Sequence, residues 1–213
     1  MTRDEIIDRI KQHRIVAIIR GIKKKDVKKI AGSLAKGGIK LLEVTMNSPE
    51  AIDSIAELDK NFGNDLLIGA GTVLEPAEAT KSIEAGAKFI ISPSFDPEVI
   101  ATTKKLNAVS IPGAFTPTEI IAAYRRGGDI IKIFPASIGP QYIKDIRGPF
   151  PHIPLMPTGG VSIENIGAYF KAGAVAAGIG SALVDVRQEI SEQALQTLSD
   201  RAAQFVQAAK IFA

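Results

Sequence analysis

The chain has 213 residues, a net charge of +3, 46% hydrophobic residues and 23% charged residues. These proportions are typical of a globular protein and exclude disordered and fibrous classes. Only 6% of the residues are aromatic. A nucleic-acid surface, which combines basic groups with stacking rings, is therefore not expected.

Cysteine is absent, and the only histidines are His13 and His152, which we expect in loops or at the surface. Disulfides, thiol nucleophiles and cysteine-ligated metals are excluded, and a histidine-rich zinc site or a Ser-His-Asp triad is disfavoured. A site built from carboxylates stays open, but we expect neither a metal nor a cofactor. The charged segment 1–14 is unlike a signal peptide, and no apolar run approaches the ~18 residues of a membrane helix. A cytoplasmic protein without a membrane partner is expected.

One pattern occurs four times along the chain: a helix tail ends in glycine and an apolar strand follows. The glycines are Gly38, Gly86, Gly128 and Gly173, and their spacings are 48, 42 and 45 residues. Each span has room for two β/α units, so four spans make the eight units of a (β/α)₈ TIM barrel. We expect each glycine to take the left-handed conformation that ends a helix. The prediction is one barrel domain over 1–213 with an extra N-terminal helix.

The remaining elements follow from apolar runs and capping motifs. "SPE" at 48–50 and "DPE" at 96–98 offer a helix N-cap followed by proline, and "TPTE" at 116–119 has the spacing of a capping box. The last helix is expected over about 188–211. A lysine-rich segment at 23–29 is expected to form a solvated helix face. Four further strands are predicted at 15–19, 66–70, 108–111 and 153–156.

Two charged residues interrupt strands that otherwise read as buried. Glu43 lies in "IKLLEVTM" on the second predicted strand, and Lys132 lies in "DIIKIF" on the sixth. Four strands apart in a ring of eight, they face each other near the carboxyl ends, where barrel enzymes assemble their sites. Taken singly, Lys132 fits a strand-end lysine that reaches solvent, and Glu43 fits a structural ion pair. Together they favour Schiff-base carbonyl chemistry, because burial lowers the pKa of a lysine and a glutamate moves protons.

Glycine-rich loops follow the seventh and eighth predicted strands. In many barrels these two loops bind phosphate through backbone N–H groups and a helix N-terminus. "PTGG" and "GIGSAL" supply the candidate binding residues Thr158, Gly159, Gly160, Gly180 and Ser181.

Two further residues are expected at the barrel mouth. "GAGTVL" after the third strand brings Thr72 there, beside small residues that suit the carboxylate of a 2-oxo acid. Arg20 ends the first strand, and an arginine suits bidentate recognition of a carboxylate or phosphate. A surface ion pair is the alternative for Arg20.

Six segments resemble, in order and spacing, the bacterial class I aldolases that cleave 2-keto-3-deoxy-6-phosphogluconate and 4-hydroxy-2-oxoglutarate. The segments are "LLEVTMNSP", "IGAGTVL", "ISPSFDPEVI", "IPGAFTP", "IKIFPAS" and "PTGGV". The resemblance implies that Lys132 forms the Schiff base and that Glu43 is the catalytic glutamate. It also implies that Thr72 and Pro93 lie beside the pyruvate carboxylate and carbonyl, and that Phe134 is the aromatic residue after the lysine.

The same resemblance assigns Gly159, Gly160 and Ser181 to phosphate binding and Arg20 to a basic position. It implies a homotrimer that uses no metal and releases pyruvate and glyceraldehyde 3-phosphate. One departure is Asn47, because many members carry an arginine there. The "NSP" pattern with "GPQYIK" resembles the branch that acts on 2-dehydro-3-deoxy-6-phosphogalactonate, in which Arg20 carries more of the anion binding.

Two other classes of function stay open. A metal-assisted sugar-phosphate isomerase or epimerase would use Glu43 as a base and Lys132 as electrostatic support, although the shortage of histidine disfavours it. A non-catalytic sugar-phosphate binding protein would bind the ligand and leave Lys132 unreactive.

Overall fold

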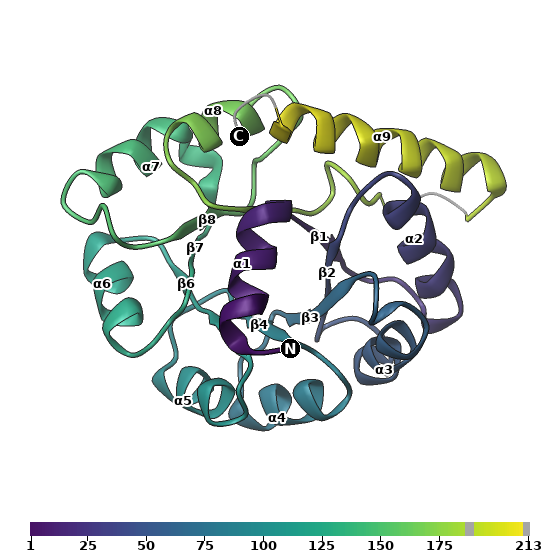
Figure 1. Cartoon of the computed structure of the whole chain (residues 1–213), viewed down its shortest axis with the longest axis horizontal. Helices are drawn as coiled ribbons and strands as arrows, with labels where there is room; N and C mark the ends of the chain where they lie inside the picture. The colour runs from purple at the N-terminus through teal and green to yellow at the C-terminus, as the bar shows by residue number, and fades with distance from the viewer. Residues whose placement is uncertain (186–189, 211–213) are drawn as a thin grey trace.

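A computed structural model describes residues 1–185 and 190–210. Parallel strands pair in two groups, in the order β5-β4-β3-β2-β1-β9 and β6-β7-β8. Together they form a curled sheet with helices around its outside (Figure 1). The strands are β1 (Ile15–Ile19), β2 (Leu41–Thr45), β3 (Leu67–Gly71), β4 (Phe89–Ile91), β5 (Val109–Ile111), β6 (Gly113–Ala114), β7 (Ile131–Ile133), β8 (Leu155–Pro157) and β9 (Ala177–Ile179).

The helices alternate with the strands along the chain, as the repeat predicts. The last helix, α9, packs against α2 and α8. The helices are α1 (Arg3–His13), α2 (Lys24–Lys36), α3 (Ala51–Phe62), α4 (Pro76–Glu84), α5 (Pro97–Lys105), α6 (Pro117–Arg125), α7 (Pro140–Arg147), α8 (Ile166–Lys171) and α9 (Glu192–Lys210), with a 3₁₀ turn at Ala136–Ile138.

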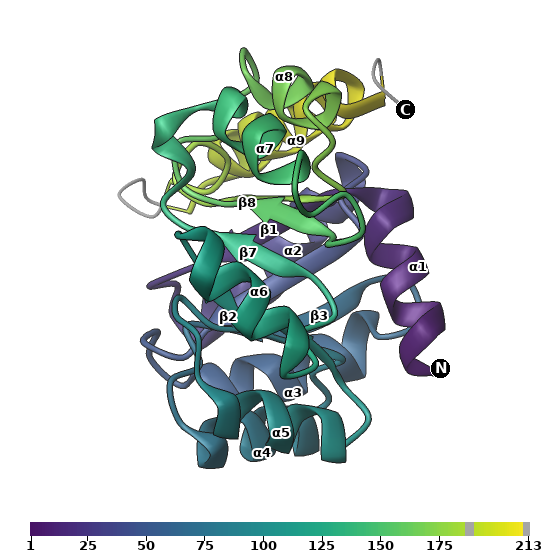
Figure 2. The same cartoon turned by 90° about the vertical axis from the view of Figure 1, so that its left-hand side faces the viewer.

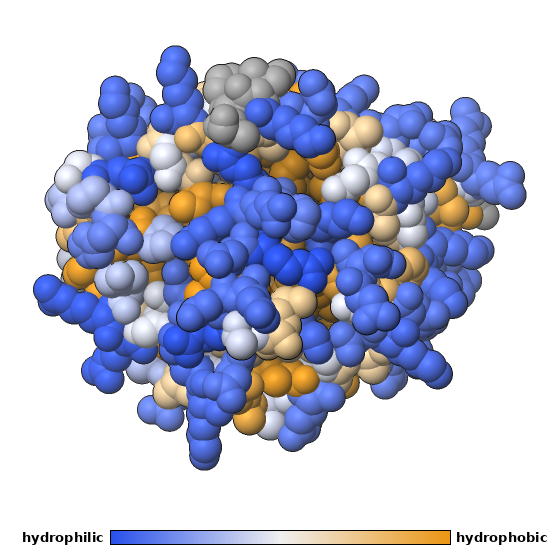
Figure 3. Space-filling model, in the orientation of Figure 1, coloured by the Kyte–Doolittle hydropathy of each residue, from blue (hydrophilic) through white to orange (hydrophobic). Residues whose placement is uncertain are grey.

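The extra N-terminal helix covers one end of the sheet. Side chains at strand starts, including Leu41 and Leu67, form an interior cluster with Ile6 and Ile10 of α1. Helix α1 therefore lies at the amino ends of the strands, on the side opposite the loops that carry the predicted site (Figure 2). Hydrophilic side chains cover much of the outward face over α1 (Figure 3). A larger apolar cluster lies between the sheet and the surrounding helices.

The predicted fifth strand, 108–111, corresponds to β5 and is followed by a second short strand, β6, that the sequence did not predict. Pro112 separates β5 from β6, because proline has no N–H to donate to a neighbouring strand. Backbone hydrogen bonds nevertheless join the segment around Pro112 to the β7 region. Lys132 N donates to Pro112 O at 2.9 Å, and Asp129 N donates to Ser110 O at 2.8 Å. On the other side, Thr158 after β8 forms a parallel bridge with Gly178 of β9.

Two of the three predicted helix caps are confirmed. Asp96 accepts hydrogen bonds from the first turn of α5, and Thr116 forms a capping box with Glu119. The prediction that Ser48 caps a helix is wrong. Helix α3 begins at Ala51, after Glu50 in the left-handed conformation, and the Ser48 hydroxyl instead contacts Gly21 and Thr45.

Three of the four repeat glycines take the left-handed conformation. Gly38, Gly86 and Gly173 have φ values of 93°, 115° and 100°. In the third repeat the prediction for Gly128 is wrong, since the left-handed residue is Gly127, with φ of 100°. Helix α6 ends at Arg125, so the turn begins one residue earlier than the pattern indicated.

The start of the last helix differs from its prediction, whereas the lysine-rich segment agrees with its prediction. Helix α9 begins at Glu192 rather than near 188, because the Ser191 hydroxyl accepts from Ala194 N at 3.1 Å and caps the helix there. Residues 188, 189 and 211 lie outside the described ranges. In the lysine-rich segment, Lys28 and Lys29 are exposed while Val27 is buried, which confirms the solvated face. None of the helices in the described ranges has both the length and the apolar character needed to span a membrane.

A buried carboxylate ties α1 to the amino end of the sheet. Asp129 lies 2.8 Å from Lys104 Nζ and 3.6 Å from Arg3 Nε, and it accepts from Ser110 N at 2.9 Å. Replacing Asp129 by alanine leaves these donors without their shared acceptor. We expect the free energy of unfolding to fall by about 2 kcal/mol, measured by urea denaturation.

The control for this prediction is Asp53→Ala. Asp53 forms an exposed ion pair with Lys24 at 3.7 Å, so its loss is expected to have a much smaller effect. Equal effects of the two substitutions would contradict the role given to Asp129.

Candidate functional site

Glu43 and Lys132 are both buried within strands, with 1% and 3% of their surfaces exposed. Glu43 lies on β2 between Ile18 of β1 and Gly69 of β3. Lys132 lies on β7 between Gly113 of β6 and Met156 of β8. A charged residue is rarely buried in a parallel sheet without a reason, because desolvation penalises its charged form.

The electrostatics of the two groups favour their neutral forms. Burial raises the pKa of Glu43, and the positive charges of Lys132 and Arg20 partly oppose this. Burial lowers the pKa of Lys132, Glu43 opposes that shift, and Arg20 adds to it. Each group thus lies within electrostatic range of the other, as their predicted positions required. The ion pairs of the described residues do not include one between them.

The Glu43 carboxylate occupies space that a glycine leaves. A Cβ added to Gly71 of β3 would lie 2.2 Å from Glu43 Oε1. The same oxygen is buried and has no hydrogen-bond partner among the described residues. A buried carboxylate oxygen without a partner is costly in a purely structural role, so this arrangement points to function.

We predict that Gly71→Ala displaces the Glu43 carboxylate. Misplacing a catalytic group by about 1 Å costs about 10²-fold in rate, so the catalytic role that the sequence predicts for Glu43 implies a loss of that order in kcat. Steady-state kinetics with a melting curve measure it. The control is Gly32→Ala in α2, where an added Cβ would meet only Phe62, at 4.0 Å. A Gly71→Ala enzyme with normal kcat would contradict the prediction.

A pocket of about 460 Å³ opens at the carboxyl ends of β1, β7, β8 and β9. Its volume is in the range of small-molecule binding sites. It contains seven of the predicted binding residues, namely Arg20, Phe134, Thr158, Gly159, Gly160, Gly180 and Ser181.

Phe134 connects the buried lysine with this pocket. Its ring centroid lies 5.0 Å from Lys132 Nζ. A Cβ added to Gly159 would lie 3.3 Å from the same ring. The ring is 40% exposed, which is high for a phenylalanine next to a buried charge. Phe134 therefore forms a wall between the Lys132 amine and the glycine loop.

The loop after β8 presents backbone and one hydroxyl to the pocket. Gly159 and Gly160 have φ values of 84° and 82°, in the region that glycine adopts without strain. Thr158 Oγ1 is buried without a hydrogen-bond partner among the described residues. A Cβ on Gly178 would lie 2.5 Å from that oxygen, so Gly178 leaves the room that the hydroxyl occupies.

Arg20 supplies positive charge at the pocket edge. It is the one charged residue among the described residues that line this pocket. Its guanidinium donates to Thr72 Oγ1 at 3.3 Å, and the ion pairs of the described residues do not include Arg20. Thr72 itself has φ of 56°, a conformation that is unusual for threonine.

Thr72 and Pro93 do not line the pocket, although each lies next to a residue of the site. Thr72 binds Arg20, as above. Pro93 lies against Gly113, the neighbour of Lys132 in the sheet, where an added Cβ would be 2.3 Å from Pro93 O. Both residues therefore belong to the side of the site nearest the buried pair.

The sequence as a whole fits one family of aldolases. Residues 6–199 match the family model for KDPG and KHG aldolase, where KDPG is 2-keto-3-deoxy-6-phosphogluconate and KHG is 4-hydroxy-2-oxoglutarate. The chain belongs to this aldolase family. Members of the family are lyases of the class I type, so this aldolase is an enzyme rather than a binding protein.

Similar proteins include both substrate branches. A probable 2-dehydro-3-deoxy-6-phosphogalactonate aldolase of Rhizobium meliloti is 37% identical over 82% of this chain and 86% of its own. A solved structure described as native KDPGal, where KDPGal stands for 2-keto-3-deoxy-6-phosphogalactonate, has a TM-score of 0.87. It is 32% identical over 93% of this chain and 95% of its own. KDPG aldolase from Legionella pneumophila, with pyruvate captured as a covalent carbinolamine intermediate, has a TM-score of 0.76 and 29% identity, over 94% of each chain.

Six residues that line the pocket of the aldolase were not predicted from the sequence. The apolar lining gives no polar signal in the sequence, and Gly178 resembles the other glycines of its segment. Among the described residues no helix N-terminus follows the last strand directly: residues 181–183 form a turn, and the next described helix begins at Glu192. The missed lining residues are Ile18, Val161, Ser162, Gly178, Ala182 and Val184.

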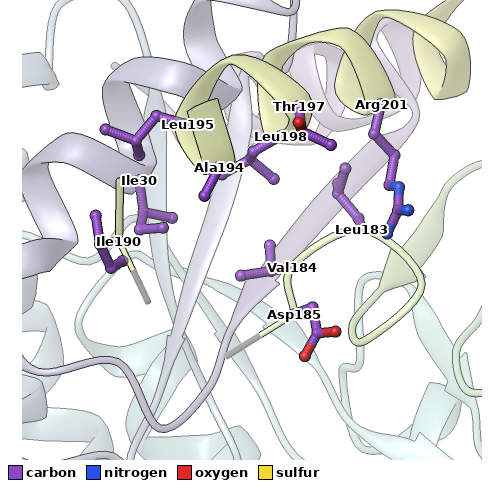
Figure 4. A pocket seen from close by; sticks show the side chains of 10 residues that line it. All are labelled: Ile30, Leu183, Val184, Asp185, Ile190, Ala194, Leu195, Thr197, Leu198 and Arg201. Atoms are coloured by element: carbon purple, nitrogen blue, oxygen red, sulfur yellow. The ribbon is translucent and has the colours of Figure 1, made fainter. Parts of the chain in front are cut away.

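A second cavity of the aldolase does not suit a sugar acid. It lies between α2, α9 and the loop after β9, and its volume is about 50 Å³ (Figure 4). Most of its labelled side chains are apolar, among them Ile30, Leu195 and Leu198. A polar, doubly charged substrate needs more space and more polar partners than this cavity offers. The described residues also contain no group of three His, Asp or Glu that could hold a metal ion.

Proposed function

We propose that this enzyme cleaves 2-keto-3-deoxy-6-phosphogluconate to pyruvate and glyceraldehyde 3-phosphate through a Schiff base on Lys132. The observation that carries the proposal is the buried Lys132, whose pKa is lowered and which lies within electrostatic range of an equally buried glutamate. The covalent pyruvate adduct of the Legionella relative supports it. The same chemistry would cleave 4-hydroxy-2-oxoglutarate to pyruvate and glyoxylate.

The reaction begins at the substrate ketone. The unprotonated Lys132 amine attacks C2, and loss of water gives an iminium ion. The C3–C4 bond then breaks, its electron pair moves into the iminium to form an enamine, and the C4 hydroxyl loses its proton. Glyceraldehyde 3-phosphate leaves. Protonation of the enamine at C3 and hydrolysis of the iminium release pyruvate and restore the amine.

Glu43 handles the protons, directly or through one water. As a carboxylate it accepts the C4 hydroxyl proton, and as a carboxylic acid it donates a proton in the steps that follow. A raised pKa suits this exchange, because it brings the two protonation states of Glu43 closer in free energy near neutral pH.

The pocket residues bind the two anionic ends of the substrate. We assign the phosphate to the backbone of Gly159, Gly160 and Gly180, the hydroxyl of Ser181 and the charge of Arg20. Thr72 and Pro93 are assigned to the pyruvate end, because they lie on the side of the buried pair. Thr158 offers its unpaired hydroxyl to a substrate oxygen.

A specific observation favours a second substrate. The Rhizobium relative and the native KDPGal structure both belong to the phosphogalactonate branch, and Asn47 stands where many other members carry arginine. 2-Dehydro-3-deoxy-6-phosphogalactonate differs from the gluconate compound at one hydroxyl and yields the same products. The alternative substrate therefore needs no change in the mechanism.

Trapping with pyruvate and borohydride tests the proposal. We expect one reduced adduct, located on Lys132 by mass spectrometry and formed equally with and without a chelator. A chelator-sensitive activity without an adduct would favour the metal-assisted isomerase or epimerase, and ligand binding without adduct or cleavage would favour a binding protein. Comparing kcat/KM for the phosphogluconate, phosphogalactonate and hydroxyoxoglutarate substrates identifies the preferred one.

We further propose that the two groups of strands close into one (β/α)₈ barrel and one domain. The hydrogen bonds from the β7 region to Pro112 and Ser110 and the Thr158–Gly178 bridge support closure on both sides. The apolar cluster outside the sheet, which runs from Ile15 to Ala209, supports a single domain. Strong protection of the Lys132 amide from hydrogen exchange is expected in a closed barrel.

We also propose a homotrimer. Three large apolar side chains are exposed in loops that follow strands at the mouth: Leu74 (51%), Phe115 (37%) and Ile138 (56%). A contiguous patch of exposed apolar side chains marks a protein contact, and we assign these three side chains to such a patch. Light scattering coupled to size-exclusion chromatography measures the oligomer, and a monomer at micromolar concentration would contradict the proposal.

A further inference from the structure

We propose that the hydroxyls of Thr45 and Ser48 form a positioning pair, which fixes Arg20 so that it binds the phosphate-bearing substrate. This inference rests on the proposed function and concerns residues that do not line the pocket. Ser48 was expected to cap a helix and does not, although it is buried and polar. Its hydroxyl therefore has another use.

The contacts of this pair lead from the second strand to the residue after Arg20. Ser48 Oγ accepts from the backbone N–H of Gly21 at 2.9 Å. It also lies 2.9 Å from the hydroxyl of Thr45, the last residue of β2. A turn in which Ser48 N donates to Thr45 O, also at 2.9 Å, keeps the two hydroxyls together. Two buried hydroxyls thus hold the peptide that follows Arg20.

The peptide enters a glycine, the residue with the greatest backbone freedom. Gly21 has φ of 70°, and an added Cβ would meet no atom within 4 Å. The chain bends at Gly21, shortly after the end of β1. The hydrogen bond that Gly21 N donates to Ser48 Oγ is therefore well placed to fix the direction in which the Arg20 side chain leaves the strand.

The other end of Arg20 is held by the same part of the sheet. Its guanidinium donates to Thr72 Oγ1 at 3.3 Å. Thr72 follows Gly71, which pairs with Thr45 in the sheet and whose carbonyl accepts from Met46 N at 2.8 Å. The backbone and the guanidinium of Arg20 are both held by the adjoining ends of β2 and β3.

A fixed Arg20 matters because the pocket has no second charged residue among its described lining. Position 47, two residues after Thr45, carries an asparagine in this chain. Arg20 thus supplies the positive charge for the substrate anion, and an arginine binds an anion well only when its planar donors are correctly oriented. Loosening it is expected to weaken anion binding rather than the chemical steps.

Ser48→Ala tests the positioning pair. Removing one hydrogen bond of this kind is expected to raise KM for 2-keto-3-deoxy-6-phosphogluconate about three- to tenfold, with kcat within about twofold. The inhibition constant of inorganic phosphate, used as a competing anion, should rise by a similar factor. Trapping of pyruvate, which carries no phosphate, should proceed at the wild-type rate.

Two variants at Thr45 keep the test decisive if Ser48→Ala folds poorly. Thr45→Val removes the hydroxyl at nearly constant volume and should raise KM, whereas Thr45→Ser keeps the hydroxyl and should behave like wild type. Thr103→Val is the matched control, because Thr103 is a buried threonine whose hydroxyl bonds within α5. It should lower the melting temperature without changing KM.

Two results would overturn the inference. One is that KM and the phosphate inhibition constant stay within about twofold of wild type in both Ser48→Ala and Thr45→Val. The other is that kcat falls while KM is unchanged, which would mean that the hydroxyls act on the chemistry. Failure of the proposed function is distinct, since it would appear as the absence of a pyruvate adduct in the wild-type enzyme.

Discussion

Replacing Lys132 by methionine is expected to abolish the borohydride-trapped pyruvate adduct and to lower cleavage by at least about 10⁴-fold. Methionine has a similar length and is apolar, so it fits the buried position on β7 without a charge. The loss then reports on the amine and not on packing. Mass spectrometry and steady-state kinetics measure it.

Lys132→Arg separates covalent chemistry from electrostatic support. Arginine keeps the positive charge but stays protonated, so it does not add to a ketone. The Schiff-base mechanism predicts that the arginine variant is as inactive as the methionine variant. An isomerase that used Lys132 only for its charge would retain part of its activity in the arginine variant.

A control lysine and a stability measurement complete this experiment. Lys105 at the end of α5 is exposed, and Lys105→Met should leave both adduct and kinetics unchanged. Lys132→Met should melt no lower than wild type, because burial of the lysine already opposes its charged form. An adduct that persists in Lys132→Met would disprove the assignment of the Schiff base.

The candidate site residues that could be predicted from the sequence are those that break a local rule. Glu43 and Lys132 interrupt apolar strands, and the glycine pair at Gly159 and Gly160 follows a strand end. Each of these signals lies within a few residues of chain, so it can be read without knowledge of tertiary contacts. In the four repeats, likewise, a glycine at a helix end is followed within a few residues by a strand.

The residues that sequence could not reveal act through distant neighbours. Ser48 resembles a helix cap, and only its contact with Gly21, 27 residues away, shows its other use. Gly71 reads as one more glycine of a loop until the Glu43 carboxylate is found in the space it leaves. The split at Pro112 likewise depends on which strands lie on either side of the proline.

Replacing Glu43 by glutamine is expected to lower kcat for cleavage by about 10²- to 10⁴-fold, because glutamine keeps the shape of the side chain but does not exchange protons. Lys132 remains, so pyruvate should still form a trappable adduct, more slowly. Loss of the Glu43 carboxylate thus lowers cleavage but keeps the adduct, whereas loss of the Lys132 amine removes both cleavage and the adduct. Pre-steady-state trapping and steady-state cleavage measure the two effects. A Glu43→Gln enzyme with wild-type kcat would show that another group moves the protons.

The same substitution predicts a pH-dependent change in stability. The pKa of Glu43 is raised in the folded state, so between its unfolded and folded pKa values the native protein binds more protons, and wild-type stability falls as the pH rises. Glutamine removes this loss. Without Glu43 the pKa of Lys132 falls further, which penalises the folded variant at low pH and not at high pH. Both effects have the same sign, so the melting temperature of Glu43→Gln relative to wild type should increase from pH 5 to pH 8. A difference that shrinks over this range would mean that Glu43 is held as a stabilised carboxylate.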